Sequence, residues 1–563
     1  MVSYVIPDTV SQHKLIGYVV LFNTDISDET IIEPTYANER DLILSVLHFH
    51  PTKREINSYK KRHVKTYPSP AASTPVQSSP RQHETIQQKT PQQLQQTSRE
   101  QRVEFINKLF QDTIEHLALI KIQSPFTPLN LSYVAKTLVH LQKLGLMPIA
   151  VLDNEYWNTP QNQQYDRLRD LMIAEALNVT EAIESAGGRA APVYTGVFST
   201  ENKLSDYVVP TPATDGNHHI NVCLSWLRNL TDLGQIPLIL PTATNDCSTQ
   251  RTISSNSGMV ALSYALAHLK ADETESDTEG SNEKMAFEPT KIVVINSEGG
   301  IPSPERKGSH VFVNIQSEYD DIKNSYQLNP QWYSTHPTGL ENLEMIKKCL
   351  EHLPITSSAI MVPAHSPTGL IANLITDKPL FSSSLPIRSA SAPLTTTTVL
   401  RHGLKVSYHT SFSTLNIDSM VKLIESSFER RLDVDNYLKR METCIDSIIL
   451  VGDYQGAAVI TKENEDGASK GNISYLDKFV VTPDSQGIGV ADILWKRIEV
   501  NYPSIVWRAR ADNKINKWYF ERSTGNMRVP GTNWTVFWYG MEGIDRINDY
   551  IKVCRKIPPS LHS

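Results

Sequence analysis

The stretch that decides the fold of the last part of the chain reads Phe479-Val480-Val481-Thr482-Pro483-Asp484-Ser485-Gln486-Gly487-Ile488-Gly489-Val490-Ala491. An apolar run ends in a turn with two glycines, and the apolar spacing that follows predicts a helix over residues 489–500. A helix start has unpaired N–H groups and a positive dipole end, so this turn can receive a phosphate or pyrophosphate without a basic side chain. The glycines let the backbone approach the anion closely.

The spacing of this turn separates it from two common phosphate loops. It is not a Walker loop, because no Gly-Lys-Ser/Thr follows, and Gln486-x-x-Gly489-x-Ala491 differs from the Rossmann spacing. It resembles the Gln/Arg-x-x-Gly-x-Gly/Ala loop that holds the pyrophosphate of coenzyme A in the GNAT acetyltransferase superfamily. Taken alone, the segment leaves an ordinary glycine-rich strand–helix turn as the alternative.

A second cluster of polar and aromatic residues follows in residues 506–522. Arg508 and Arg510 share one face of a predicted strand over 505–510, where arginines can bind a dicarboxylate bidentately. Asn513 comes where the chain leaves this strand, and Tyr519 falls on a short predicted helix. Ion pairs or solvation for the arginines, and core packing for Tyr519 beside Trp518 and Phe520, are the alternatives.

The elements around these motifs predict an α+β domain with a sheet of mixed direction. A helix is expected over 417–429, strands over 447–451, 456–462 and 473–481, and a closing strand over 535–539. The turn at Gly452-Asp453 indicates an antiparallel hairpin.

Residues from about 101 onward show short apolar strands alternating with helices. Strands are predicted over 117–122, 147–152, 237–240 and 291–296, and helices over 131–141, 165–186, 222–233 and 258–269. This alternation predicts an α/β domain with a parallel sheet covered on both faces.

Composition excludes several classes of function. The net charge of −7 does not favour a nucleic-acid or anionic-membrane surface, and no run of 18 apolar residues indicates a membrane span. The five cysteines are scattered without a C-x-x-C pair, so neither a metal site nor a disulfide framework is expected, and they fit a reducing compartment.

The domain organisation is predicted in three parts: a leader, short helical element (39–63) and disordered linker over 1–100; an α/β domain over 101–390; and the α+β domain over 395–563. Residues 68–100 are rich in Pro, Ser, Thr and Gln, which is typical of a flexible linker. Residues 272–284 carry six acids and indicate a solvated insertion. The first 35 residues contain no arginine and several acids, so no transit peptide is evident.

Several motifs taken together resemble the N-acetylglutamate synthases of the fungal and vertebrate mitochondrial type. In the last domain they are Tyr475–Phe479, Gln486–Ala491, Trp507-Arg508-x-Arg510, Asn513–Phe520 and Trp534–Trp538. Upstream, Lys291–Ser303, Asn373–Pro379 and Asp433–Arg440 agree with the same family. The resemblance implies an amino-acid-kinase-like parallel-sheet sandwich followed by a GNAT-type N-acetyltransferase domain.

The resemblance also implies roles for individual residues. Lys478, Arg508 and Asn513 would bind L-glutamate, and Tyr519, helped by Asn513, would serve the chemistry. Acetyl-CoA, as co-substrate, would be held by Phe479, Val480, Val481, Gln486, Gly487, Ile488, Gly489, Val490 and Ala491. L-arginine as inhibitor, N-acetylglutamate kinase as protein partner, a homo-oligomer and a mitochondrial matrix location are implied in the same way.

Two departures leave alternatives open. Lys121-Ile122-Gln123-Ser124-Pro125 lacks the glycine pair of catalytic amino-acid kinases, so phosphoryl transfer in the first domain is not expected. A catalytically weak, arginine-sensing partner of the kinase is one alternative to a synthase, and an acetyltransferase for another acceptor such as aspartate is a second. Retention of Lys478, Gln486, Gly489, Arg508, Asn513 and Tyr519 favours the synthase.

Overall fold

The computed structural model describes residues 116–562 except 144, 159–164, 201–207, 246, 273–287, 307, 366–381, 386–395, 465–471 and 487–488. The helical element expected at 39–63, the linker at 68–100 and nearly all of the acidic insertion lie outside the described residues, as do Asn373–Pro379. Among the described helices, none has the length and apolarity needed to cross a membrane.

A mostly parallel sheet forms the first domain, as the sequence predicted. Its eight described strands, in spatial order, are β11 (Phe312–Asn314), β13 (Thr398–Arg401), β12 (Ser358–Pro363), β10 (Glu288–Asn296), β1 (His116–Ser124), β2 (Leu146–Asn154), β7 (Ile236–Ile239) and β3 (Ala190–Val193). Neighbouring strands are parallel except β12 and β13, which are antiparallel.

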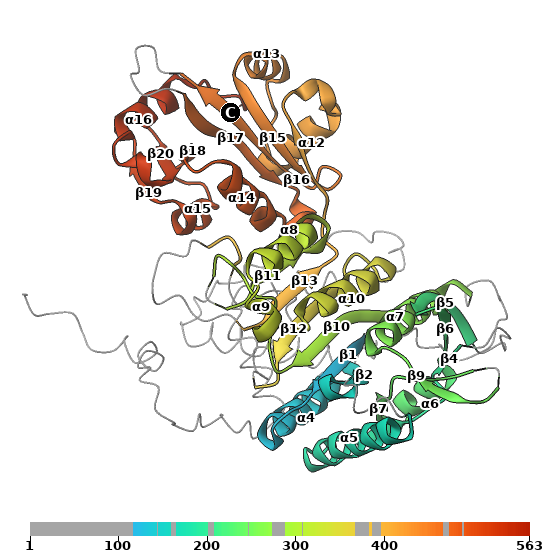
Figure 1. Cartoon of the computed structure of the whole chain (residues 1–563). Helices are drawn as coiled ribbons and strands as arrows, with labels where there is room; N and C mark the ends of the chain where they lie inside the picture. The colour runs from blue at the N-terminus through green and yellow to red at the C-terminus, as the bar shows by residue number, and fades with distance from the viewer. Residues whose placement is uncertain are drawn as a thin grey trace, which may run out of the picture. The chain divides into compact units, whose positions relative to one another are not determined.

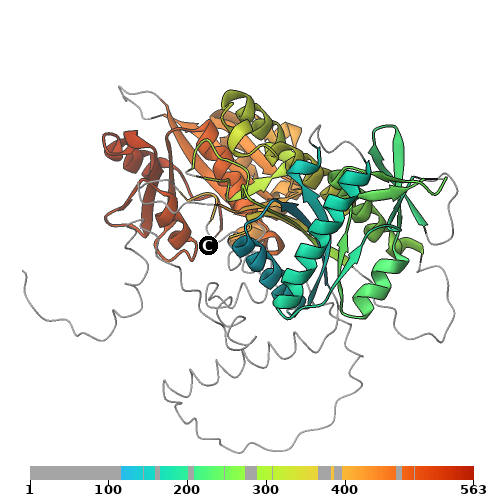
Figure 2. The same ribbon diagram turned by 60° about the horizontal axis from the view of Figure 1, so that its bottom comes forward.

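Helices cover both faces of this sheet, because alternate side chains of its apolar strands point to opposite faces. Leu117 and Leu119 of β1 share a core with Met259 of α7 and Leu343 of α10, and α4 packs on β2 and α5. Figures 1 and 2 show these two layers. The helices are α4 (Pro128–Lys143), α5 (Tyr165–Ser185), α6 (Ser225–Asp232), α7 (Ser255–Asp272), α8 (Ile315–Leu328), α9 (Trp332–Thr335) and α10 (Gly339–His352), with the 3-10 turn η1 (Glu155–Asn158).

A second, five-stranded sheet in this domain was not predicted. Its strands, in spatial order, are β5 (Val208–Asp215), β6 (His218–Cys223), β4 (Phe198–Ser199), β8 (Thr242–Thr244) and β9 (Gln250–Thr252). The helix expected over 222–233 is therefore wrong at its start: Val222 and Cys223 pair with β5, and α6 begins at Ser225.

In the last domain, the described residues form a seven-stranded sheet of mixed direction, and a sheet of mixed direction was expected. Its strands, in spatial order, are β14 (Val406–His409), β15 (Ile445–Val451), β16 (Gly456–Glu463), β17 (Ile473–Val481), β18 (Ile505–Arg510), β20 (Trp534–Tyr539) and β19 (Gly525–Arg528). Strand β13 belongs to the eight-stranded sheet and β14 to the seven-stranded sheet. The eight-stranded sheet therefore extends past residue 395, the expected start of the last domain.

Helices also flank the seven-stranded sheet. They are α12 (Ile417–Phe428), α13 (Val434–Cys444), α14 (Val490–Asn501), α15 (Asn516–Arg522) and α16 (Ile547–Lys556), with the 3-10 turns η3 (Phe412–Thr414), η4 (Pro483–Ser485) and η5 (Met541–Gly543). Figure 1 shows α12 and α13 on one side of this sheet and α14 and α15 on the other. A site residue therefore contacts different helices according to the face of the sheet on which its side chain lies.

Candidate active site

Strand β17 carries a bulge and then loses its neighbour on one side. The register with β16 shifts at Asp477, because Val459 pairs with Lys478 but Ile460 pairs with Leu476. On the other side, the only registered pair between β17 and β18 in the described chain is Tyr475 with Val506. The last third of β17 therefore has an open edge toward β18. A bulge inserts one residue and re-aims the side chains after it.

The two faces of β17 after the bulge have different partners. Lys478 lies above the Tyr437 ring of α13, with Nζ 4.7 Å from the ring centroid, and Val480 joins the core under α12 and α13. Phe479 faces the other way, and its ring lies 5.2 Å from Trp518 of α15 and 6.4 Å from Trp495 of α14, between ring centroids. The predicted glutamate-binding lysine and a predicted acetyl-CoA residue thus lie on opposite faces of one strand.

The strand–turn–helix motif has the predicted form. The strand leads into η4, and Gly489 stands at the N-cap of α14 with φ +94°, a left-handed conformation that favours glycine. Val490 is buried, whereas Gln486 and Ala491 are half-buried. Gly487 and Ile488 of the predicted pyrophosphate loop lie outside the described residues. The described part supplies a helix N-terminus directly after the open edge of β17.

Tyr519 lies in an aromatic core on the same face as Phe479. Its ring centroid is 5.6 Å from those of Trp507 and Phe537 and 5.7 Å from that of Trp518. Burial raises the pKa of the Tyr519 hydroxyl above its ordinary value. The hydroxyl therefore stays protonated at neutral pH, as a general acid must before it donates its proton. Packing and a chemical role are compatible here, since Trp518 contacts Phe479 as well.

Arg508 and Arg510 both lie on β18, but their surroundings differ. The Arg508 guanidinium donates hydrogen bonds to the carbonyls of Cys554 and Ile557 at the end of α16 and stacks 4.5 Å from the Trp534 ring centroid. Arg510 is exposed and has no hydrogen-bond or ion-pair partner among the described residues. Arg508 thus fixes α16 to the sheet, a structural contact that the sequence analysis did not predict.

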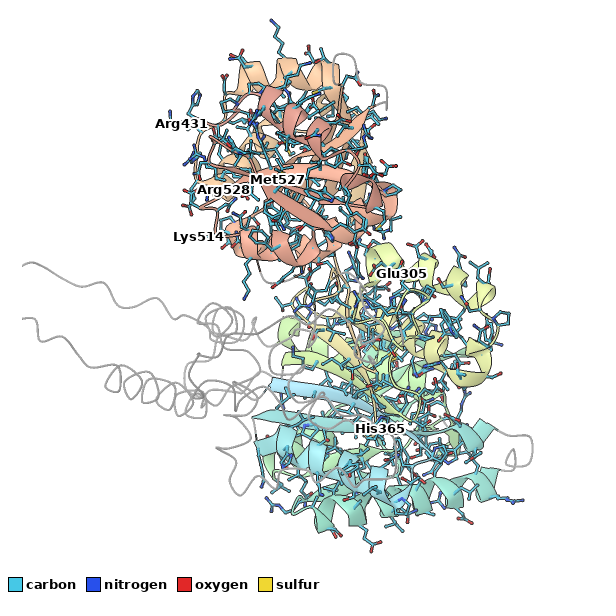
Figure 3. All side chains as sticks on the ribbon, turned by 90° about the vertical axis from the view of Figure 1, so that its left-hand side faces the viewer. Glu305, His365, Arg431, Lys514, Met527 and Arg528 are labelled. Carbon is cyan, nitrogen blue, oxygen red and sulfur yellow. The ribbon has the colours of Figure 1, made fainter. Side chains whose placement is uncertain are left out.

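Exposed cations surround the end of β18. Arg510 pairs with Trp534 of β20, and the next residue of β20, Thr535, pairs with Arg528 of β19. Figure 3 shows Lys514, Met527 and Arg528 on the same side of the domain. Because neighbouring residues of a strand point to opposite faces, Arg510 and Arg528 lie on opposite faces of the sheet.

Asn513 and Asn516 shape the turn between β18 and α15. The Asn513 side-chain oxygen accepts a hydrogen bond from the Ile515 N–H at 3.1 Å. The buried Asn516 amide donates to the Arg510 carbonyl at 2.7 Å and to the Ala511 carbonyl at 3.2 Å, while its Oδ1 has no partner in the described structure. Sequence analysis selected Asn513 and missed Asn516. The two amides hold the short helix that carries Tyr519.

A buried charge network surrounds Lys478. Asp477 accepts from Lys478 Nζ at 2.6 Å and from Arg440 of α13 at 2.8 Å, and Arg440 also pairs with Glu463. Burial alone would raise the pKa of Asp477, but the Lys478 ammonium and the Arg440 guanidinium outweigh burial and hold that pKa below its ordinary value. Asp477, Arg440 and Glu463 were not predicted as site residues, although Arg440 belongs to the motif 433–440. Neighbouring side chains of a regular strand point to opposite faces, and the bulge at Asp477 lets its carboxylate and the Lys478 ammonium meet.

In the first domain, the lysine that opens the expected kinase motif is engaged internally. Lys121 is buried, and its Nζ contacts Asp153 at 3.0 Å, Asn256 at 2.7 Å and Asn342 at 2.8 Å. An ammonium has three N–H donors, and these three acceptors match them.

Known proteins resemble this chain over most of its length. Residues 407–557 match the family described as NAT, the N-acetyltransferase of N-acetylglutamate synthase. The mitochondrial amino-acid acetyltransferase of Coprinopsis cinerea is 32% identical, over 90% of this chain and 86% of its own. That of Laccaria bicolor is 35% identical, over 78% of this chain and 80% of its own. The N-acetylglutamate synthase structure from Neisseria gonorrhoeae with coenzyme A and N-acetyl-glutamate covers 77% of this chain and 97% of its own, with 12% identity and a TM-score of 0.40.

The sheet of mixed direction and the matched residues define the last domain as an N-acetyltransferase. The chain belongs to the family of fungal mitochondrial amino-acid acetyltransferases, the N-acetylglutamate synthases, and it is an enzyme of amino-acid acetyl transfer. The predicted family, fold class and activity are therefore confirmed. The roles of single site residues stay predictions.

Proposed function

We propose that acetyl-CoA binds on the α14 and α15 side of β17 and that L-glutamate binds on the α12 and α13 side. The observation that carries this proposal is the bulge at Asp477, after which Lys478 and Phe479 point to opposite faces beside an open strand edge. The helix N-terminus at Gly489 receives the pyrophosphate, and the open edge of β17 receives the acetyl end.

The reaction needs no covalent enzyme intermediate. The α-amine of glutamate, once deprotonated, attacks the thioester carbonyl carbon, and the C–S bond breaks as the amide forms. Holding both substrates at the open edge supplies orientation. The Val481 N–H at this edge is suited to the developing oxyanion. A water relay beside Asn513 takes the proton of the amine, and Tyr519 donates a proton to the departing thiolate.

The cations on the acceptor side account for an acidic amino acid. Lys478 is held between Asp477 and the Tyr437 ring, so its ammonium has a fixed position. Arg508 and Arg510 lie on the same face of the adjoining strand. We assign the substrate carboxylates to Lys478 and this arginine pair, with Arg508 also anchoring α16. Glutamate is proposed over aspartate on the family resemblance.

Regulation and location follow from relatives. A solved structure of the Neisseria gonorrhoeae synthase contains coenzyme A and L-arginine, and the fungal relatives are named mitochondrial. We therefore propose inhibition by L-arginine and a mitochondrial matrix location. On the family resemblance alone, we propose a homo-oligomer and a complex with N-acetylglutamate kinase.

The experiment that tests this function is thiol release by the purified full chain with acetyl-CoA and a panel of amino acids, with and without L-arginine. Release with glutamate that exceeds release with aspartate, and that falls when arginine is added, is expected. Release with another acceptor alone would overturn glutamate as substrate. Binding of acetyl-CoA without release for any acceptor would overturn the catalytic assignment and favour a regulatory partner.

A further inference from the structure

At the open edge of β17, the backbone N–H of Val481 donates a hydrogen bond to a residue outside the sheet. The Thr482 N–H donates to the Gln455 carbonyl on the β16 side at 2.9 Å. Successive N–H groups of a strand point to opposite edges, so the Val481 N–H points to the edge where β18 has diverged. There it donates to the Ser427 hydroxyl oxygen at 3.3 Å.

The position of Ser427 is fixed by the end of α12. Leu423 and Ile424 of this helix pack in one core with Val480 of β17. The helix ends at Phe428, and Glu429 follows in a left-handed conformation with φ 55°. Ser427 is half-buried, and within the described chain its own hydroxyl proton has no acceptor. The hydroxyl therefore has a donor to offer at the point where Val481 is engaged.

The neighbouring serine, Ser426, makes a different hydrogen bond. The Ser426 hydroxyl donates to the Leu423 carbonyl of its own helix at 3.1 Å and does not reach β17. The two serines have the same chemistry and adjacent positions, so Ser426 serves as a matched control.

We propose that Ser427 is a second hydrogen-bond donor to the acetyl-CoA carbonyl group that the Val481 N–H receives. This inference rests on the proposed function, which places acetyl-CoA along β17. When a carbonyl oxygen approaches, it accepts the Val481 N–H in place of the Ser427 oxygen. The Ser427 hydroxyl then turns its free proton toward the same oxygen, since a hydroxyl rotates to suit its partner.

Acetyl-CoA offers two kinds of carbonyl to this pair of donors. One is the thioester carbonyl, whose oxygen gains negative charge during attack by the amine, so a donor there lowers the barrier of the chemical step. The other is a pantetheine amide, whose charge does not change during the reaction, so a donor there contributes to binding alone.

The experiment compares Ser427→Ala, Ser427→Thr and Ser426→Ala in the full chain by kcat, the KM of acetyl-CoA, the Kd of CoA and the melting temperature. If Ser427 meets the thioester, Ser427→Ala lowers kcat about 10- to 100-fold and leaves the Kd of CoA unchanged. If it meets a pantetheine amide, the Kd of CoA and the KM rise together, about 5- to 10-fold, at constant kcat. Either result supports the inference, and Ser427→Thr, which keeps the hydroxyl, restores most of the loss.

If Ser427→Ala has the same kcat, KM and CoA Kd as Ser426→Ala, the inference is overturned. This holds also when the melting temperature of Ser427→Ala falls, because a change in stability alone assigns the hydroxyl to helix packing. The wild-type chain keeps the two failures apart. Absence of thiol release by the wild type overturns the proposed function, whereas an active wild type matched by Ser427→Ala overturns the role of Ser427 alone.

Discussion

The Tyr519 side chain combines aromatic packing with the proposed role of general acid. Three aromatic rings bury it and raise its pKa. Tyr519→Phe keeps the ring contacts and removes the proton. We expect kcat to fall about 10²- to 10⁴-fold, the contribution typical of a general acid, with the melting temperature nearly unchanged. Thiol release at saturating substrates, together with a melting curve, measures both.

A matched control for this variant is Tyr502→Phe. The Tyr502 hydroxyl donates to Asp446 of β15 at 2.8 Å, two strands away from β17, so we expect its loss to affect stability and not kcat. Unchanged kcat in Tyr519→Phe would rule out the acid role.

Lys478 is the residue whose loss separates acceptor binding from acetyl-CoA binding. Lys478→Met removes the ammonium but keeps an apolar stem above Tyr437. We expect the KM of glutamate to rise about 10- to 100-fold, as for loss of a charge-assisted hydrogen bond, with the KM of acetyl-CoA unchanged. Lys462→Met on the adjacent strand removes an exposed ion pair with Asp446 and is the control. Equal glutamate KM values for the two variants would contradict the assignment.

The site residues that the sequence analysis selected all lie within short motifs. Lys478, Gly489 and Tyr519 were selected because local spacing and family resemblance identify them. Asp477 and Arg440 were not selected, because their contact depends on the bulge in β17 and on the position of α13 beside it. Ser427 lies 54 positions before Val481, so no local pattern connects the two. The two carbonyls that accept hydrogen bonds from Arg508 lie at the end of α16, a helix that the sequence analysis did not predict.

At the scale of elements, the start of α14 depends on a backbone that only glycine adopts easily. Gly489→Ala forces a side chain into φ +94° and costs about 1–2 kcal/mol of local stability. Because the strained turn is part of the predicted pyrophosphate site, we expect the Kd of CoA to rise about 10-fold, which calorimetry measures. Gly531→Ala, at φ +75° in the loop before β20, imposes similar strain outside the turn before α14. A CoA Kd that rises equally in both variants would contradict a role for the turn.

Elements were predictable where one periodicity dominated. β1, β2, β17 and α14 have continuous apolar patterns and were expected within a few residues. The five-stranded sheet was missed because Pro210 and Pro212 interrupt β5 and the strands beside it are short. Leu224, Leu227 and Leu230 follow at intervals of three, a helical spacing that extended the predicted helix back into the end of β6. Strand pairing between distant segments decides such cases, and local propensity does not.

At the scale of the whole molecule, the first domain carries a buried histidine that affects acid stability. Burial lowers the pKa of His310 from about 6.5 to about 4. Between pH 6.5 and 4 the unfolded chain therefore binds a proton that the folded chain does not. The free energy of unfolding falls by up to about 3 kcal/mol as pH decreases through this window. Above pH 6.5 the neutral His310 causes no such loss.

We expect His310→Asn to flatten this pH dependence. Urea unfolding at pH 7 and pH 5 measures it, and the difference between the two midpoints should shrink in the variant. His562→Asn, at an exposed position near the chain end, should keep the wild-type difference. A wild-type pH dependence in His310→Asn would contradict the assignment.

The opposite orientations of Lys478 and Phe479 have a consequence for the order of events. Two substrates that arrive from different sides of one sheet do not share an entrance, so neither blocks the other and neither has to wait. Initial rates should follow a sequential ternary-complex pattern with random order. Each product should compete with its own precursor: free CoA with acetyl-CoA, and N-acetylglutamate with glutamate.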